Sequence, residues 1–194
     1  MQKLARADLL SLEQYASERA SIRSEVIAHK LLRNVRVGPN MTWCFEDRIT
    51  IRYQILEMLR AERLFESDGI QGELDAYNPL VPDGHNWKVT LLIEFPDPEV
   101  RRTALGKLIG VEDRCWIQVG GLERVFAKAD EDLERETDEK TSAVHFLRFE
   151  LSPGMVSAMK NNAPLGVGVD HDNYRHAVSP LPLPVRDALR ADLD

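Results

Sequence analysis

The sequence has very little cysteine, and none of it stands in a pattern that cysteine chemistry requires. Cys44 and Cys115 are the two cysteines, and both lie in apolar, strand-like segments. Isolated cysteines without a Cys-x-x-Cys pair are typical of small buried residues, and structural disulfides are rare in reducing compartments. We therefore expect neither a disulfide nor a cysteine-based metal centre.

Long hydrophobic runs and an excess of basic residues are also lacking. No apolar run approaches the roughly 20 residues that a membrane-spanning helix needs, and residues 1–15 do not have the apolar core of a signal peptide. Acidic residues outnumber basic ones, 32 to 25, which gives a net charge of −7. Such a charge disfavours nucleic acid and anionic membrane. We expect a cytoplasmic protein that binds neither.

The common catalytic and nucleotide-binding motifs are absent. The sequence contains no GxSxG, GxGxxG or GxxxxGK[ST] pattern. It also contains no Glu-x-x-His, the pair that di-iron helical bundles use, although several glutamates stand in apolar or ordered segments: Glu57, Glu62, Glu73, Glu94 and Glu150. We expect no metal and no cofactor, and an enzymatic role stays undecided, with a non-enzymatic one favoured.

The hydrophobic pattern that is present predicts an α+β fold. Ser11 with Gln14 forms a capping box, Asp47 and Ser152 can cap later helices, and Gly120-Gly121 predicts a hairpin turn. The predicted helices cover about residues 12–31, 47–65, 69–77, 98–109, 153–160 and 184–193. The predicted strands cover about 41–46, 87–95, 114–119, 122–127, 143–151 and 165–169. The continuous apolar run of 87–95 indicates a strand that is covered on both faces.

We expect a single domain over residues 1–194. A mostly antiparallel sheet of five or six strands, covered by helices, forms the α+β core at 39–194, and residues 1–38 form an N-terminal helical arm that packs across the sheet or across a second subunit. Residues 129–142 are almost entirely polar, which predicts a solvated loop with a mobile tip. In the segment LGVGVD, the glycines Gly166 and Gly168 indicate a close backbone approach or a bulge.

The most informative stretch is the helix predicted from residues 46–66. Its apolar residues fall nearly all round the helical wheel, which predicts a buried helix. It nevertheless carries a set of charged residues, called here the charged seam: Arg48, Arg52, Glu57, Arg60 and Glu62. An unpaired buried charge greatly lowers stability. We therefore expect these side chains either to form ion pairs or to have a function such as binding. The charged seam is the binding site that the sequence predicts.

Arg48 and Arg52 require an anion nearby. They are one helical turn apart, so they repel, and they lie at the helix N-terminus, where the macrodipole already disfavours cations. The anion is either an internal carboxylate, such as Glu46, Glu94, Glu150 or another, or a bound small anionic ligand. If the protein is an enzyme, Arg48 and Arg52 clamp an anionic substrate and Glu57 acts as acid or base, which requires a raised Glu57 pKa.

The histidines give weaker signals. His171 and His176 stand five residues apart in a mixed polar segment, 170–176, which is more typical of a polar turn than of a metal site. His145 lies among apolar residues of its strand, and we interpret it as a core residue rather than a ligand. A metal site at this segment would require two more donors beside His171 and His176.

Several longer strings resemble a known bacterial family. They are FEDRITIRYQILEMLRAER, ELDAYNPLVP, LLIEFPDPEVRR and HFLRFELSPGMVSAMK, and they are similar to domain-of-unknown-function family number 3501, over nearly the whole chain. The resemblance implies no established activity and locates no functional residue. The setting of the family's genes implies a link to redox or peroxide-stress physiology.

Taken together, these patterns predict a cytoplasmic binding, accessory or assembly protein. We expect a homo-oligomer, with the helix of residues 46–63 at its binding or assembly surface and a protein partner or small anionic ligand. The alternative is an enzyme or small-ligand binder that uses Arg48, Arg52 and Glu57 as described above.

Overall fold

A computed structural model describes residues 2–133, 135, 137 and 139–194. The predicted helices are present with small differences at their ends, because the caps at Ser11, Asp47, Asp97 and Ser152 each accept a hydrogen bond from the first turn. The helices are α1 (Leu12–Lys30), α2 (Arg48–Glu62), α3 (Ser67–Tyr77), α4 (Pro98–Lys107), α5 (Pro153–Lys160) and α6 (Leu183–Arg190). There are also three 3-10 turns in the described residues: η1 (Arg6–Asp8) before α1, η2 (Asn78–Leu80) after α3 and η3 (Glu112–Arg114) after α4.

The strands form two antiparallel sheets, so the fold is α+β as predicted, with a second sheet that the sequence pattern did not separate. The first sheet has five strands in the order β1-β2-β3-β7-β6: β1 (Asn34–Arg36), β2 (Met41–Glu46), β3 (Asn86–Ile93), β7 (Val144–Glu150) and β6 (Lys128–Ala129). The second has four in the order β5-β4-β8-β9: β5 (Val125–Phe126), β4 (Cys115–Val119), β8 (Leu165–His171) and β9 (Tyr174–Val178).

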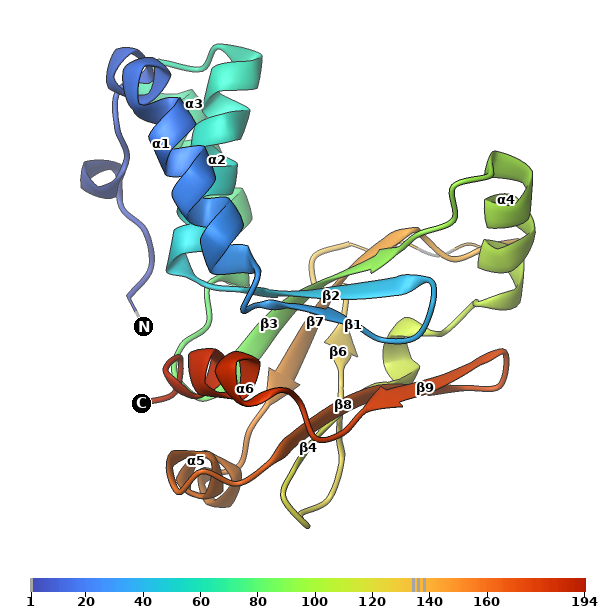
Figure 1. Ribbon diagram of the computed structural model, residues 1–194. Coiled ribbons are helices and arrows are strands. Elements are labelled where there is room, and N and C mark those ends of the chain that lie inside the picture. The colour runs from blue at the N-terminus through green and yellow to red at the C-terminus, as the bar shows by residue number, and fades with distance from the viewer. Residues whose placement is uncertain (1, 134, 136, 138) are drawn as a thin grey trace.

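The main hydrophobic core includes the buried residues of both sheets together with those of α5 and α6. Trp43 stacks on Phe149 with ring centroids 5.4 Å apart, and Phe45 meets Trp87 edge-on at 6.4 Å. Figure 1 shows the five-stranded sheet above the four-stranded sheet, with α5 and α6 at one end and α4 at the other.

The other face of the five-stranded sheet is only partly covered. Along β3, buried residues alternate with half-buried ones, and Lys88 and Thr90 lie on the half-buried side. The prediction that 87–95 is covered on both faces is therefore wrong. Figure 1 shows the reason: α1, α2 and α3 stand upright on one end of this face and do not cover the rest of it.

Helices α2 and α3 share a small core with the N-terminal segment, and it is separate from the main core. Its buried residues come from the N-terminal segment, α2, α3 and the loop after η2: Leu4, Ile51, Ile55, Leu59, Leu74 and Val81. Helix α2 contributes Ile51, Ile55 and Leu59 to this core, and its Leu56 is buried on the side that faces α1. The expectation that it is buried all round is wrong, because Ile49 is 51% exposed and Arg60 and Glu62 lie in solvent.

The predicted hairpin and the close approach at the glycines are confirmed. β4 pairs with β5 after the turn at Gly120. A Cβ atom at Gly168 would lie 2.4 Å from Cζ2 of Trp116, and one at Gly166 would lie 2.6 Å from Oγ of Ser179. Larger residues at these two positions would force the strands apart.

Two segments differ from their predictions. The segment 170–176 is the hairpin between β8 and β9 rather than a polar turn alone. The segment 129–142 begins with the last residue of β6, and Thr141 near its end is buried. Both ends of the segment are therefore packed against the fold, and residues 134, 136 and 138 lie outside the described part. Within the described residues, no helix has the length and apolar character needed to cross a bilayer.

Candidate functional site

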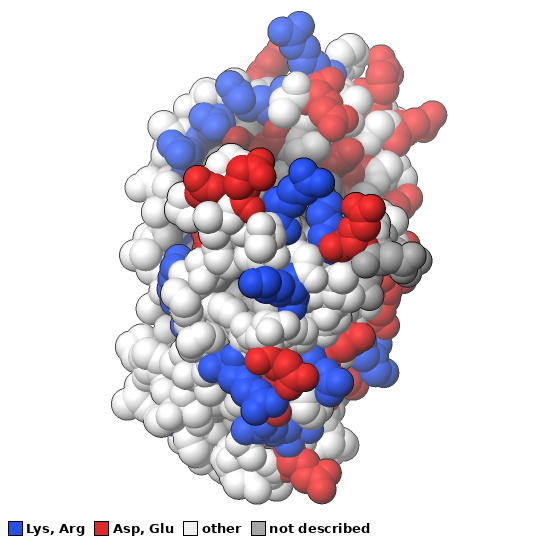
Figure 2. Space-filling view, turned by 90° about the vertical axis from the view of Figure 1, so that its right-hand side faces the viewer, with Lys and Arg blue, Asp and Glu red and all other residues white. Residues whose placement is uncertain are grey.

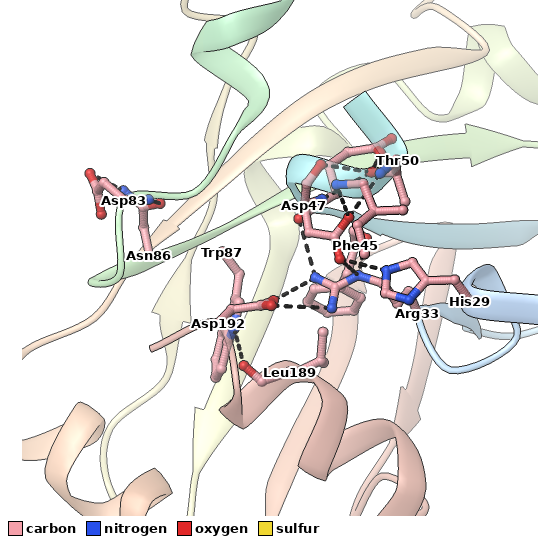
Figure 3. A network of polar contacts seen from close by, with 12 residues as sticks. His29, Arg33, Phe45, Asp47, Thr50, Asp83, Asn86, Trp87, Leu189 and Asp192 are labelled. Atoms are coloured by element: carbon pink, nitrogen blue, oxygen red, sulfur yellow. Dashed lines mark hydrogen bonds and ion pairs between the residues drawn. The ribbon is translucent and has the colours of Figure 1, made fainter. Parts of the chain in front are cut away.

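A buried polar network fixes the start of α2. Asp47 caps the helix by accepting from the N–H groups of Ile49 and Thr50, each at 2.9 Å, and its other oxygen lies 2.6 Å from Nε2 of His29. The guanidinium of Arg33, which is 2% exposed, lies 3.4 Å from the same oxygen and makes a two-pronged pair with Asp192 at 2.5 and 3.2 Å. Figure 3 shows Arg33 at the centre of this network. The orientation of α2 is therefore fixed at its N-terminus.

The anion that faces Arg48 and Arg52 is Asp8 of the N-terminal segment. Nη2 of Arg48 lies 2.6 Å from Oδ1 of Asp8, and Nε of Arg52 donates to the backbone oxygen of Asp8 at 2.6 Å. None of the three carboxylates considered from sequence takes this place. Glu46 accepts from Thr50 and Thr90, Glu94 pairs with Arg36, and Glu150 pairs with Arg148.

Glu57 is neutralised by α1. Arg19 donates to its two carboxylate oxygens at 2.7 and 2.8 Å, and the hydroxyl of Tyr15 donates a further short hydrogen bond. The hydrogen bond from Arg19 lowers the pKa of Glu57 to about 2, with Tyr15 and Arg60 acting in the same direction. A general base at neutral pH needs the opposite shift, so the environment of Glu57 does not fit the acid–base role.

Glu57→Gln is expected to lower the free energy of unfolding by about 1–2 kcal/mol at pH 7. Because the pKa of Glu57 is lower in the folded state, its contribution is present above about pH 4.5 and is lost as the pH falls toward 2. Urea unfolding at a series of pH values should therefore show the two proteins converging in acid. Glu18→Gln, an exposed position on α1, is the matched control; a constant gap at every pH would contradict the prediction.

The two remaining residues of the charged seam act at a distance. Arg60 is exposed and contributes to the low pKa of Glu57. Burial raises the pKa of Glu73 on α3, and the exposed Glu62 adds to this shift. The charged seam is thus not one pocket. Arg48 and Arg52 line a groove of about 590 Å³ against α1, whereas Glu57, Arg60 and Glu62 do not line it.

A cleft lies on a different side of α2, where α3 meets the open face of the five-stranded sheet. Its volume is about 350 Å³, which is within the range of small-molecule sites. Mostly apolar side chains form its walls, with a few charged ones: Met58, Glu73, Ala76, Tyr77, Pro79, Leu80, Lys88, Glu131, Asp132, Phe146, Leu147 and Arg148.

The charged groups of the cleft are not all neutralised by one another. Arg148 pairs with Glu131 through two contacts of 2.7 Å, and Asp132 pairs with Arg135. Lys88 has no hydrogen-bond or ion-pair partner in the described part of the chain, and burial, then the neighbouring Arg148, lowers its pKa. The cleft therefore presents one unpaired ammonium beside an apolar wall.

Sequence reasoning missed this cleft because its residues come from five separated parts of the chain. One signal was available. The run of 87–95 contains two charged residues, Lys88 and Glu94, and a lysine within such a strand must reach solvent, a carboxylate or a ligand.

The cysteines and the flagged histidines do not form a second site. Burial raises the pKa of Cys44 to about 11 and that of Cys115 well above its usual value, so both thiols are poor nucleophiles. His171 accepts from the N–H of Asn173 and lies 3.1 Å from the oxygen of Ile109. His176 packs edge-on against Tyr174. Both ring nitrogens of His171 are therefore occupied.

The comparisons with known proteins agree with the resemblance seen in the sequence. The model of DUF3501, described as a protein of unknown function, matches residues 3–193. The chain belongs to the DUF3501 family. A crystal structure at 1.90 Å of a novel protein of unknown function from Burkholderia pseudomallei K96243 is 52% identical, covers 100% of both chains and superposes with a TM-score of 0.94. No curated protein matches, so no activity comes to this DUF3501 protein from a relative.

Proposed function

We propose that this DUF3501 protein is a binding protein for a small amphipathic carboxylate, which it holds in the cleft between α3 and the open sheet face. The observation that carries the proposal is the unpaired ammonium of Lys88 beside the apolar walls of the cleft. A carboxylate would complete the pairing of Lys88, and its apolar body would cover Met58, Leu80 and Phe146.

The proposal is non-enzymatic, in line with the preferred interpretation of the sequence. Lys88 is half-buried without a partner, which lowers the stability of the fold. Residues that lower stability in this way are typical of functional sites. Glu73 lines the same cleft, and its pKa is raised by burial and by Glu62, so it repels a bound carboxylate less than an ordinary glutamate would. The raised pKa values of both thiols give no support to a redox role for the cysteines.

Lys88→Met is expected to weaken binding of octanoate by about 10–100-fold, the value of one charge-assisted hydrogen bond. It should also raise the melting temperature by a few degrees, because an unpaired half-buried charge is removed. Isothermal titration with octanoate, together with displacement of 8-anilinonaphthalene-1-sulfonate, measures the first effect. Lys160→Met, on the exposed end of α5, is the matched control.

Arg48→Gln separates this proposal from the anion clamp at Arg48 and Arg52. Nε of Arg48 is buried with no hydrogen-bond partner among the described residues, so the groove at Arg48 is the second candidate for the anion. If octanoate binding survives Arg48→Gln and is lost in Lys88→Met, the cleft is the site. The reverse result assigns binding to the groove, and no binding to the unmodified protein rejects both.

Assembly into homo-oligomers stays a prediction with one supporting feature. Large apolar side chains are exposed where α1 ends and α2 begins: Ile27, Leu31, Leu32 and Ile49. Two-fold interfaces are commonly built on such surfaces. The surface viewed from the α4 side differs from this apolar surface, because it carries interspersed acidic and basic side chains (Figure 2).

A further inference from the structure

We propose that Glu112, Thr141, Ser142 and His145 form a binding site for one first-row divalent cation. The site lies on the core side of β7, opposite the face that lines the cleft: His145 is 0% exposed, whereas Phe146 and Arg148 on the same strand line the cleft. The proposal is independent of the carboxylate cleft.

Asp130 fixes the ring of His145. Oδ2 of Asp130 lies 2.6 Å from Nδ1, and Oδ1 accepts from the N–H of Phe146 at 2.9 Å and from Arg135 at 3.2 Å. A carboxylate held in this way keeps the proton on Nδ1. The lone pair of Nε2 is then directed away from Asp130, as in the carboxylate–histidine–metal arrangement of many metal sites.

The atoms around Nε2 have the spacing of a coordination shell. Nε2 lies 2.9 Å from Oγ1 of Thr141, 3.1 Å from the backbone oxygen of Ser142 and 3.7 Å from Oε2 of Glu112. Thr141 and Glu112 are 3.3 Å apart. A cation with ligand bonds of about 2.0–2.2 Å holds neighbouring ligand atoms roughly 3.0–3.5 Å apart, so the separations among Nε2, Thr141 and Glu112 suit one shared cation after small adjustments, and the Ser142 oxygen lies at a similar distance from Nε2.

Hydrogen counting leaves two candidates for the space next to Nε2. If Nδ1 carries the proton of neutral His145, Nε2 faces three oxygen atoms, and the hydroxyl of Thr141 is the one group among those three that can donate. The backbone oxygen of Ser142 and the carboxylate of Glu112 are acceptors. Either a second proton on the ring or a metal ion next to Nε2 can join the ring to these acceptors.

The donor set defines the class of ion. One imidazole nitrogen, one carboxylate and two neutral oxygens suit Zn²⁺, Mn²⁺ or Fe²⁺, whereas the absence of a thiolate from the set disfavours the softer Cu⁺. In the described part of the chain, Glu112, Asp130 and His145 form the one group of three or more metal-ligating side chains that lie within 4.8 Å of one another. The site is closed, so its expected role is to join η3, β7 and the loop before it.

The test uses the full chain, purified without a metal-affinity tag. We expect about one equivalent of metal by inductively coupled plasma mass spectrometry, and a melting temperature that falls after chelator dialysis and recovers by several degrees when Zn²⁺ or Mn²⁺ is added. Glu112→Gln, which preserves size, should abolish the recovery, while His171→Gln should retain it. His145→Gln provides a second variant if it folds.

Two results would overturn the proposal. One is a metal-free protein whose melting temperature does not respond to either ion, in which case the ring holds a second proton. The other is an equal response in the wild type and in Glu112→Gln, since binding would then occur elsewhere. Loss of the response in His171→Gln alone would assign it to a surface histidine and would also reject this site.

Discussion

Arg33→Met is expected to lower the free energy of unfolding by about 3–5 kcal/mol, because it leaves a buried carboxylate without its cation. Arg33 donates to Phe45 and Glu46 backbone oxygens at 2.9 and 3.2 Å and pairs with Asp192, so four acceptor atoms lose their donor at once. The melting temperature should fall by roughly 6–20 °C. Arg36→Met is the control, because Arg36 is 61% exposed and its pair with Glu94 is in solvent.

The loss should depend on pH in a defined direction. Burial raises the pKa of Asp192 to about 6, although Arg33 acts against this shift. Without Arg33 the folded-state pKa rises further, so the variant is most stable in acid and loses stability as the pH increases through that value. Urea unfolding at pH 5 and pH 8 measures the difference. A variant that is equally destabilised at both values would show that Asp192 is not the group left unpaired.

A double variant tests the pair itself. Arg33→Met with Asp192→Leu removes both charges and should recover part of the loss, since apolar pairs often replace buried ion pairs at little cost. Recovery should be incomplete, because the oxygens of Phe45 and Glu46 still lack a donor.

Trp87→Ala is expected to cost about 3–5 kcal/mol, from lost burial and the cavity that remains. Trp87 is 0% exposed and packs edge-on against Phe45. Its Nε1–H also donates to the oxygen of Leu189 at 3.0 Å, which attaches α6 to the five-stranded sheet. Denaturant unfolding monitored by circular dichroism measures the change.

Trp87→Phe separates the two contributions. It keeps most of the apolar area but removes the donor for Leu189, so a loss of about 1–3 kcal/mol is expected. Phe65→Ala, at a side chain that is 67% exposed, should change stability by no more than about 0.5 kcal/mol. If Trp87→Phe were as damaging as Trp87→Ala, the hydrogen bond would be the dominant contribution.

Local elements of this DUF3501 protein could be predicted well because their signals are local. Ser11 with Gln14, Asp47 and Ser152 each mark a helix start by a side chain that bonds to a backbone N–H two or three residues on. The close approach at Gly168 could be predicted because a glycine inside a strand needs a spatial reason.

The pairing of distant segments could not be predicted. The partner of Arg48 is Asp8 and that of Arg33 is Asp192, and nothing in the residues near either arginine identifies these partners. The strand β9 was missed because its sequence, YRHAV, is mostly polar and its outer side is exposed. The division into two sheets likewise depends on which strands meet, which is a property of the whole chain.

The candidate sites show the same limit. Lys88 gave a local signal, whereas the cluster at His145 joins residues from η3, β7 and the preceding loop. The interpretation of His145 as a core residue rather than a ligand considered its own strand alone. The proposed cation site depends on Glu112 and Thr141, which the topology brings to it.

The separate cores of the helical unit and the two sheets imply two levels of cooperativity. Helices α2 and α3 share the small cluster around Ile55 and Leu74, while the sheets share the larger one. Amide exchange in these helices should therefore occur through partial opening that leaves the sheets closed. The carboxylate cleft takes one wall from each unit. An occupant would therefore bridge them, slow exchange in α3 and convert two loosely linked parts into one folding unit.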